Sequence, residues 1–335
     1  IKNPLTQVAR AAKRLPAGVR FALTGTPIEN RLSELWSIFD FLMPGLLGTR
    51  ESFAKRFESP VEHAEGDSAA RLQALVSPFV LRRVKEDVVA DLPEKIEDTV
   101  MAQLTGEQRK LYLANQDRIA QQVQHREASE FKKDKLKVLA ELTKLRQICC
   151  DPRLHYEDYK AGSAKLDTCM ELVHGALDGG HRILLFSQFT GMLDIIGKRL
   201  AKEDIAFLKL TGASSKESRA KMVAQFQAGE VPVFLISLKA GGVGLNLTAA
   251  DVVIHYDPWW NVAAQDQATD RAHRIGQQHT VTVYKLIAKD TIEERIMQMQ
   301  ESKRDLVNSV LGGDGISSAL FTREDVLALL GGDGR

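Results

Sequence analysis

Several residue types and sequence features are scarce in this 335-residue chain, and each scarcity makes some classes of function less expected. There are only three cysteines, Cys149, Cys150 and Cys169, and two of them are adjacent. That number and spacing do not indicate a disulfide framework or a four-cysteine zinc site, so we expect a reducing compartment. The sequence also lacks a signal peptide and any run of about 18 apolar residues, so no membrane partner is expected.

An excess of one charge sign and a set of metal ligands are missing too. The formal net charge is +1, so composition gives no sign of nucleic-acid binding, and a DNA site would have to be a local basic patch. His174, His181 and His255 are scattered without the spacing of metal ligands. We therefore predict no metal site in this chain.

A complete ATP site is also missing. The nearest match to a phosphate loop runs from Gly191 to Arg199, but it has one residue too many between its glycines and no Ser or Thr after Lys198. Its pattern is that of the interior of an amphipathic helix. We therefore reject it as a phosphate loop.

The most informative stretch runs from Ser237 to Gln278 and reads SLKAGGVGLNLTAADVVIHYDPWWNVAAQDQATDRAHRIGQQ. A glycine-rich loop follows an apolar run, and a segment of helical character carries Arg271 and Arg274. Glycines that leave a buried strand allow backbone N–H groups to approach a phosphate or sugar closely. Two arginines three residues apart lie on one face of a helix. The stretch therefore predicts an anion-binding edge at the carboxyl ends of a parallel sheet.

The C-terminal half alternates apolar runs with amphipathic segments. This alternation predicts an α/β fold with a doubly wound parallel sheet. The predicted strands are 183–187, 205–210, 231–237, 251–256 and 280–287. The predicted helices are 192–202, 215–227, 262–274, 290–311 and 323–330.

The N-terminal half is predicted to be mostly helical. We expect a helix over 3–15 with Asn3 as its cap and Pro4 at its first position. The other predicted helices are 32–42, 105–125 and 131–150, and the predicted strands are 19–23 and 93–104. The helix over 131–150 is rich in lysine, which is typical of a solvated face.

Four motifs carry a family resemblance. AGGVGLNLTAAD, YDPWWN and QATDRAHRIGQ, in this order, resemble motifs V and VI of the Swi/Snf-type ATPases of helicase superfamily two, and LTGTPIEN at 23–30 resembles motif III. The match to motifs V and VI has no gap over about forty residues, which makes it far more specific than a lone glycine loop. The resemblance covers residues 1 to about 311. It implies a RecA-like second helicase lobe with helical insertions and the tail end of the first lobe.

The resemblance also implies a domain division. Residues 1–104 would be the end of the first RecA-like lobe with a helical insertion, closed by the strand at 93–104. Residues 105–160 would be a helical protrusion and linker, 161–311 the second lobe, and 312–335 a C-terminal tail. The opening IKNP follows the acidic ATPase motif in this family. We therefore expect ATP and Mg²⁺ to be bound mainly by a part upstream of Ile1, and this fragment alone to be inactive.

By resemblance, the motif residues have two kinds of role at the nucleotide. Arg271 and Arg274 would be arginine fingers that neutralise charge on the transferring phosphoryl group, oriented by Gln267 and Asp270. From the residues alone, the same arginines could instead form structural salt bridges with Asp266 and Asp270. The loop residues that would lie near ribose or phosphates are Gly242, Gly244 and Asn246.

DNA contacts are expected on a face that spans both lobes. Hydroxyls and backbone amides at helix starts suit contacts to phosphates, which position a protein without reading sequence. The expected contact residues are Thr26, Asn30, Ser187, Gln188, Thr211, Gly212, Ser237, Lys239 and Thr248.

Three further interpretations stay open at this point. Arg82, Arg83 and Lys85 could contact phosphates or form a solvated basic turn beside acidic neighbours. The tryptophans of the DPWWN stretch, Trp259 and Trp260, could stack on bases, but we favour packing. We expect His273 to be a structural histidine.

The resemblance implies an ATP-dependent translocase or remodeller of double-stranded DNA. Its partners would be double-stranded DNA, ATP and a DNA-bound complex such as RNA polymerase or a nucleosome. It would be cytoplasmic and nucleoid-associated in a bacterium, or nuclear in a eukaryote. The alternatives are a strand-separating helicase, and a non-catalytic docking module for DNA or protein.

Overall fold

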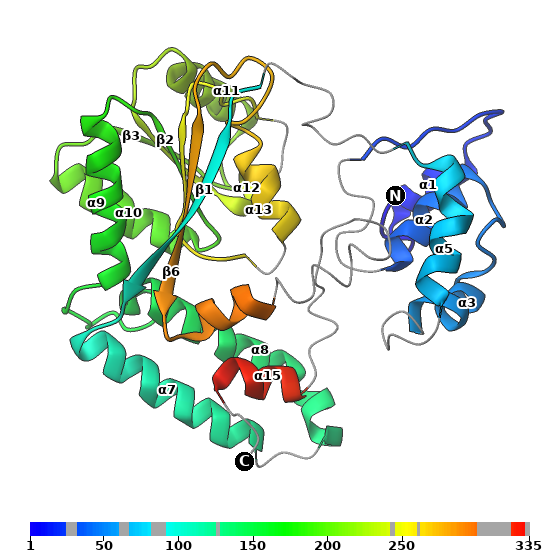
Figure 1. Ribbon diagram of the computed structural model, residues 1–335, viewed down its shortest axis with the longest axis horizontal. Coiled ribbons are helices and arrows are strands. Elements are labelled where there is room, and N and C mark those ends of the chain that lie inside the picture. The colour runs from blue at the N-terminus through cyan, green and yellow to red at the C-terminus, as the bar shows by residue number, and fades with distance from the viewer. Residues whose placement is uncertain are drawn as a thin grey trace. The chain divides into compact units, whose positions relative to one another are not determined.

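The computed structural model describes residues 1–24, 32–59, 67–81, 92–124, 128–241, 245–259, 262–299 and 323–331. The chain divides into two units (Figure 1). The smaller unit consists mainly of residues 1–84. The larger unit consists mainly of residues 85–298, with the C-terminal segment from 321 onward.

The larger unit is built on a six-stranded sheet in which every pairing is parallel, with the strand order β1-β6-β5-β2-β4-β3. The strands are β1 (Lys95–Gln103), β2 (Ile183–Ser187), β3 (Phe207–Leu210), β4 (Val233–Ser237), β5 (Val252–His255) and β6 (Val281–Lys289). Every residue of β2, β4 and β5 is buried, as in a parallel sheet that is covered on both faces. The predicted α/β fold is confirmed.

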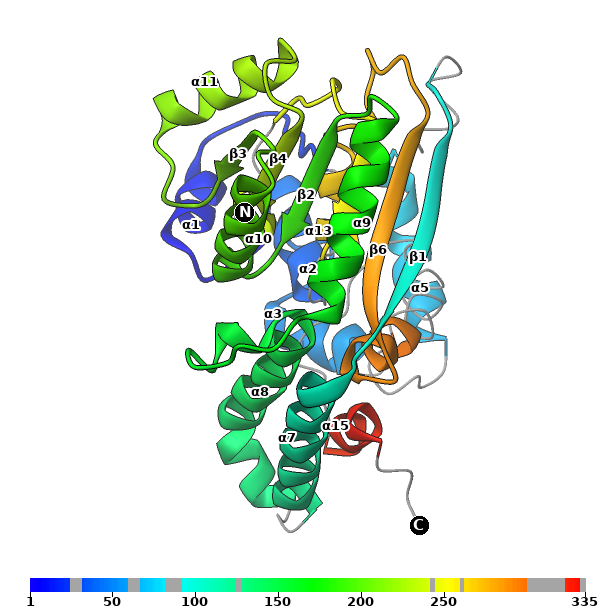
Figure 2. The same ribbon diagram turned by 90° about the vertical axis from the view of Figure 1, so that its left-hand side faces the viewer.

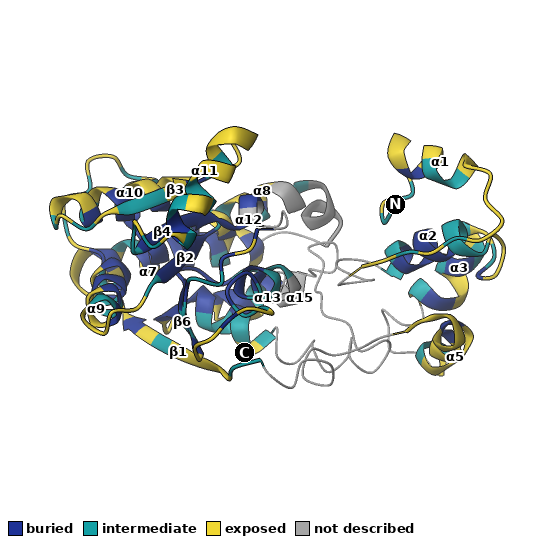
Figure 3. Ribbon diagram, turned by 90° about the horizontal axis from the view of Figure 1, so that it is seen from above, coloured by how far each residue is buried: buried dark blue, intermediate teal, exposed yellow. Residues whose placement is uncertain are grey.

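Helices cover both faces of the sheet, and each face has its own hydrophobic core. Successive side chains of a strand point to opposite faces, so neighbouring residues belong to different cores. Ile183 and Leu185 pack with α9 (Ala164–Asp178) and α10 (Thr190–Lys202). Leu184 and Phe186 pack with α11 (Lys216–Gln227) and α13 (Val262–Thr269) on the other face. The buried strands therefore lie between exposed helix surfaces (Figure 3).

The segment that was predicted to be a helical protrusion, called the helical insertion from here on, lies beyond the carboxyl end of the sheet (Figure 2). It contains α7 (Gly106–Gln124), α8 (Ala128–Cys150) and the short 3-10 helix η3 (Pro152–Leu154), and α15 (Arg323–Leu330) packs on α7. Gln116 donates to the carbonyl of Leu330 at 2.6 Å, and the Tyr112 hydroxyl accepts from the backbone N–H of Ile292 at 2.7 Å. These bonds join the insertion to the C-terminal part of the chain. The helices predicted at 105–125, 131–150 and 323–330 are confirmed.

The smaller unit is helical in the part that the structure describes. Its elements are α1 (Gln7–Arg14), α2 (Leu32–Leu42), α3 (Arg50–Phe53), the π-helix η1 (Ala54–Glu58), α5 (Ser68–Val76) and the 3-10 helix η2 (Ser77–Phe79). Leu35 and Phe39 of α2 pack against Phe53, Phe57 and Leu72. The predicted helix at 32–42 is confirmed.

Two predictions for the start of the chain are wrong. The buried strand expected at 19–23 is absent, and Val19, Phe21 and Leu23 are 73, 84 and 100 % exposed. A strand needs a neighbour for its backbone bonds, and the described residues of this unit contain no strand. The first helix begins later than expected, because Thr6 caps it by accepting from the backbone N–H of Ala9 at 3.2 Å.

The strand predicted at 93–104 is present as β1, but its partner differs from the expectation. It pairs with β6 over its whole length, from Lys95 opposite Val281 to Gln103 opposite Lys289, and so belongs to the sheet of the larger unit. Glu97 accepts from Lys285 of β6 at 2.6 Å. Burial by itself raises the pKa of Glu97, but its bonds with Lys285 and Lys95 lower that pKa to about 2. The boundaries at residues 104, 160 and 311 stay predictions.

Other element ends also differ slightly. The helix predicted at 262–274 ends at Thr269. The helix predicted from Asp290 begins at residue 292, because Asp290 has a φ of 58°, a left-handed conformation that no helix interior accommodates. Gly191 to Arg199 lies inside α10, which confirms that it is not a phosphate loop.

His255 gives the larger unit a specific pH dependence. Its ring is buried, stacks on Phe186 at 5.5 Å and lies 2.8 Å from the Thr269 hydroxyl through Nε2. Its buried Nδ1 has no hydrogen-bond partner in the described part of the chain. Burial and then the charge of Lys285 lower its pKa to about 3, with Glu97 opposing. The folded protein therefore holds this ring neutral, whereas the unfolded chain protonates it below about pH 6.5.

We predict that the free energy of unfolding falls as pH decreases from 6.5 toward 3, by up to about 1.4 kcal/mol per pH unit from this group. The unfolded state binds the extra proton in that window, so acid favours unfolding. The measurement is urea unfolding of the wild type and His255→Gln at pH 7.5, 5.5 and 4.5. The difference between the two proteins should change in favour of the variant as pH falls. A difference that stays constant would contradict this assignment.

Candidate functional site

Two serines that were predicted to contact DNA lie at the carboxyl ends of neighbouring strands. Ser187 ends β2, Ser237 ends β4, and the two face each other in the strand pairing. Both are buried. Ser187 donates to a carboxylate oxygen of Asp257, and the Ser237 hydroxyl accepts from the backbone N–H of Ala240 at 3.3 Å. The structure brings these residues together as predicted, but their hydroxyls hold loops in place and do not point outward.

Arg146 lies beneath the loop that follows β2. It comes from α8, is only 1 % exposed, and donates to the side-chain oxygen of Gln188 at 3.1 Å and to the carbonyl of Pro258. Its guanidinium also lies over the Phe189 ring at 5.8 Å. A single side chain therefore bonds the loops that follow β2 and β5.

Asp257 is an acidic residue that binds the same loop after β2. Its side chain is fully buried, and one oxygen accepts from the backbone N–H of Gln188 at 3.2 Å. Burial raises the pKa of Asp257, while the charge of Arg146 and the bond from Ser187 oppose that rise. The carboxylate thus holds the Gln188 backbone, and Arg146 holds its side chain.

Charge pattern alone does not predict this position of Arg146, because the helix over 131–150 is rich in lysine, which is typical of a solvated face. A signal was present. Arg146 is four residues after Leu142 and three before Cys149, both of which are buried, and residues at those spacings share a helix face. Helical periodicity thus puts Arg146 on the apolar face of α8.

A buried ion pair lies close by. Nζ of Lys165, on α9, is 2.5 Å from Oε2 of Glu293, and both side chains are fully buried. The backbone N–H of Ala288 also donates to Glu293, at 2.9 Å. Lys165 lies over the ring of Tyr256, whose hydroxyl donates to the carbonyl of Cys150 at 2.9 Å. Burial lowers the pKa of Lys165, but the charge of Glu293, its hydrogen bond to Lys165 and the nearby Cys150 and Asp257 together outweigh this effect, and the net shift is upward.

The end of β3 presents an exposed turn. Thr211 is half-buried, and its backbone N–H donates to the Ser214 hydroxyl at 3.2 Å. Gly212 is exposed, and a Cβ added to it would meet nothing within 4 Å. Ser215 then caps α11 by accepting from the backbone N–H of Ser218 at 3.1 Å. This turn leaves backbone groups accessible beside a helix start.

Arg271 and Arg274 lie in the turn after α13 and not on the helix itself. The carbonyl of Arg271 accepts from the backbone N–H of Leu247 at 2.9 Å, and Arg274 donates to the carbonyl of Leu245 at 3.2 Å. Arg271 is 6 % exposed. Burial and then the charge of Arg274 lower its pKa, with Asp270 opposing. The two guanidinium groups therefore interact electrostatically beside the exposed Asn246.

The predicted carboxyl-end position of these arginines is wrong. His273 donates to the carbonyl of Pro93, which precedes β1, at 2.7 Å, and Gln277 donates to the carbonyl of Ala250, which precedes β5, at 2.8 Å. The turn thus lies toward the amino ends of the strands, because α13 runs back along the sheet. His273 is confirmed as a structural histidine.

The two residues that were predicted to orient the arginines, Gln267 and Asp270, are close to them in the chain. Gln267 lies on α13 and Asp270 directly follows it, and both are half-buried. The charge of Asp270 acts on Arg271 and also on Lys95 of β1. Electrostatic coupling between Asp270 and Arg271 is therefore present, as both the finger interpretation and the salt-bridge interpretation require.

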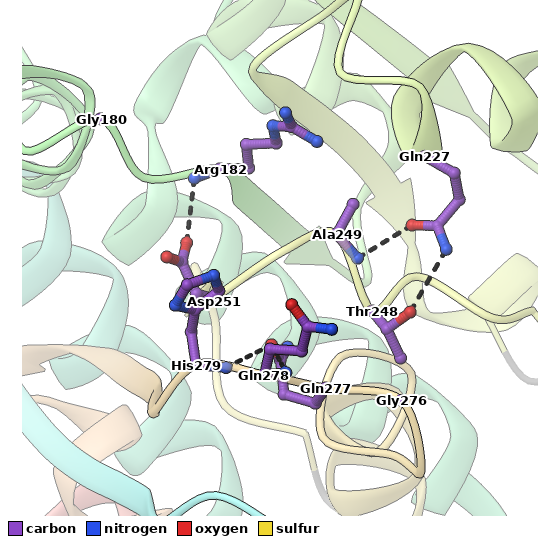
Figure 4. A pocket seen from close by; sticks show the side chains of 10 residues that line it. All are labelled: Gly180, Arg182, Gln227, Thr248, Ala249, Asp251, Gly276, Gln277, Gln278 and His279. Carbon is purple, nitrogen blue, oxygen red and sulfur yellow. Dashed lines mark hydrogen bonds between the residues drawn. The ribbon is translucent and has the colours of Figure 1, made fainter.

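Thr248 is separated from the other predicted DNA contacts. It lines a pocket of about 390 Å³ at the amino ends of β2, β5 and β6 (Figure 4). Its hydroxyl accepts from Gln227 at 3.3 Å, and nearby Asp251 accepts from the backbone N–H of Arg182 at 3.0 Å. Ser237 lies at the opposite end of the sheet, so Thr248 does not share a DNA-facing edge with the strand-end serines.

Several predicted residues lie outside the described part of the chain. They are Thr26, Asn30, Arg82, Arg83, Lys85, Gly242, Gly244 and Trp260. The backbone of Lys239 lies in the short helix α12 (Leu238–Gly241). Trp259 packs against the core on the α11 and α13 face, as we favoured.

Neither a metal centre nor a membrane segment emerges from the residues that the structure describes. Among them, no three His, Cys, Asp or Glu side chains gather into a possible metal site. No helix among them is long and apolar enough to cross a bilayer.

Comparison with known proteins identifies the family. The SNF2-related domain matches residues 1–154, and the helicase conserved C-terminal domain matches residues 164–276. The Sulfolobus solfataricus SWI2/SNF2 ATPase core in complex with dsDNA is 37 % identical with a TM-score of 0.59, and the match covers 98 % of this chain and 70 % of that one. The chain belongs to the Swi/Snf-type ATPases.

The curated relatives are longer than this chain. The putative ATP-dependent helicase/translocase YwqA of Bacillus subtilis is 41 % identical over 97 % of this chain and 36 % of its own length. The DNA repair and recombination protein RAD26 of Saccharomyces cerevisiae is 35 % identical over 93 % of this chain and 30 % of its own length. The chain thus spans about a third of the length of the curated relatives it matches.

We predict that Lys165→Met destabilises the larger unit by about 3–5 kcal/mol, because it leaves the Glu293 carboxylate buried without its cation. Lys165→Met combined with Glu293→Gln should recover most of that loss, because no charge then remains unpaired. Chemical unfolding followed by circular dichroism measures both. Equal stability of the single and double variants would show that the buried pair is not what holds α9 to the end of β6.

Proposed function

We propose that the intact protein is an ATP-dependent translocase of double-stranded DNA that remodels DNA-bound complexes. This chain contributes the second motor lobe. Its own tasks are to present two arginines to the phosphates of ATP and to contact the DNA backbone. Both ATP and Mg²⁺ are bound mainly by a part of the protein upstream of residue 1, and no metal ligand is assigned to the described residues.

The arginine pair is the observation that carries the proposal. Burial and the positive charge of Arg274 lower the pKa of Arg271, with Asp270 opposing, so an approaching anion would further stabilise its charged form. A phosphate between the two guanidinium groups would offset both effects, since arginine binds phosphate oxygens with a planar fork. Asn246 lies between Leu245 and Leu247, whose backbones bond to this turn, which fits a role near ribose or phosphate.

The carboxyl ends of β2, β3 and β4 support the DNA role. The Gln188 loop follows the buried strand β2, and the Thr211–Gly212 turn follows β3, with β4 between these two strands in the sheet. Backbone N–H groups at helix starts suit DNA phosphates, and such contacts do not depend on base sequence. We assign Ser187 and Ser237 to holding these loops. Contacts from Thr26, Asn30, Lys239 and Thr248 stay predictions.

We predict that Arg271→Ala and Arg274→Ala each lower DNA-stimulated ATP turnover of the intact protein about 100-fold or more, because each removes charge stabilisation from the transferring phosphoryl group. Binding to duplex DNA across a salt series should be unchanged. Arg109→Ala removes the same charge from an exposed position of α7 and is the matched control. Normal turnover in both finger variants would assign the arginines to structural salt bridges.

A strand-separating helicase is the main alternative. We predict ATP-driven displacement of a third strand from a DNA triplex without separation of a forked duplex, because tracking along the backbone needs no unpaired bases. The packed position of Trp259 fits this, since it leaves that ring against the core. Efficient fork unwinding would favour the helicase. ATP-independent DNA binding with no turnover would favour the docking module.

A further inference from the structure

We infer that Arg146 is a positioning residue that fixes the Gln188 loop for contact with DNA. It would make the helical insertion and the DNA-facing edge of the second lobe a single rigid piece. The inference rests on the proposed DNA role of the Gln188 loop. It assigns to the insertion a part in DNA binding that requires no DNA contact of its own.

The bonds of Arg146 lead to two different loops. It donates to the Gln188 side chain at 3.1 Å and to the carbonyl of Pro258, and it covers the Phe189 ring. These loops follow β2 and β5, which are adjacent in the sheet. Because a guanidinium donates in several fixed directions within one plane, Arg146 can set the spacing between the two loops.

Asp257 holds the same loop from the other side. It accepts from the backbone N–H of Gln188 at 3.2 Å and from the Ser187 hydroxyl. The backbone and the side chain of Gln188 are therefore fixed by opposite charges that also stabilise each other. A residue that contacts a phosphate gains affinity when its position is set beforehand, because less ordering remains to be done on binding.

Anchoring of α8 does not require Arg146. Gln108 donates to the carbonyl of Ile148 at 2.9 Å, and Tyr256 donates to the carbonyl of Cys150 at 2.9 Å. Both bonds hold the same end of α8. The reach of Arg146 to the loops is thus additional to what keeps the helix in place, which argues for a role at the edge itself.

The nearby Lys165–Glu293 pair supplies a matched control. It is equally buried and joins neighbouring elements, but none of its described bonds reaches Gln188. A purely structural role for buried charge predicts the same outcome for both pairs. The positioning role predicts a difference.

The experiment uses the intact protein with Arg146→Met and Asp257→Asn combined, so that no buried charge is left unpaired. The DNA concentration that half-maximally stimulates ATP turnover should rise about tenfold, the effect of losing roughly one charged hydrogen bond. Turnover at saturating DNA should change less than twofold. Lys165→Met with Glu293→Gln should leave the half-maximal DNA concentration unchanged. Equal shifts in both pairs, or no shift in either, would overturn the inference.

A double-mutant cycle tests the coupling directly. Gln188→Ala should raise the half-maximal DNA concentration, and adding it to the Arg146→Met and Asp257→Asn pair should have little further effect, because both changes remove the same contact. Additive effects would overturn the inference. Arg146→Lys keeps the charge but not the fork, and should give an intermediate shift; this variant decides the question if the charge-free pair does not fold. Failure of the proposed function itself would appear differently, as a wild type whose turnover ignores DNA.

Discussion

Four buried charges at the carboxyl end of the sheet are the constraint on which the larger unit depends. Arg146, Lys165, Asp257 and Glu293 are all removed from water, and each would cost several kcal/mol to bury alone. Their formal charges cancel, so the cost is offset only when α8, α9 and the ends of β5 and β6 meet in one arrangement. Apolar packing alone would tolerate small shifts between these elements, whereas buried ions tolerate few. The charges therefore specify how the helical insertion meets the sheet.

Much of the fold could be predicted from the sequence, because the central strands are short apolar runs between amphipathic helices. Strand partners could not. The segment at 93–104 has the pattern of a strand, but periodicity does not state that its neighbour is β6, which is more than 170 residues away. The segment at 19–23 is apolar without being a strand, since the described residues around it offer no edge to pair with. The hydrophobic pattern of a segment indicates which of its residues are buried. Which strand it pairs with depends on the other elements that fold beside it.

The candidate site was predictable to the extent that motifs name residues. Arg271, Arg274, Gln188 and the strand-end serines were found by resemblance, and their positions came only from the structure. The hydroxyls of the serines form hydrogen bonds within the protein, and the arginines lie away from the carboxyl ends of the strands. Arg146 was missed because charge was given more weight than its place on the apolar stripe of α8. A buried arginine is recognised by periodicity when its neighbours three and four residues away are apolar.

The pairing of β1 with β6 has a consequence for how the protein is made. Lys95 and Val281 are partners although 281 − 95 = 186 residues separate them, and α7, which follows β1, receives α15 from the C-terminal segment. On a ribosome, β1 and α7 emerge long before either partner exists. Because contacts of such long sequence separation form late and slowly, β1 must wait without a partner strand until β6 has been made. Synthesis of β6 is therefore the step that gives β1 its partner and covers the open edge of β5, so that fewer unpaired strands are left to aggregate.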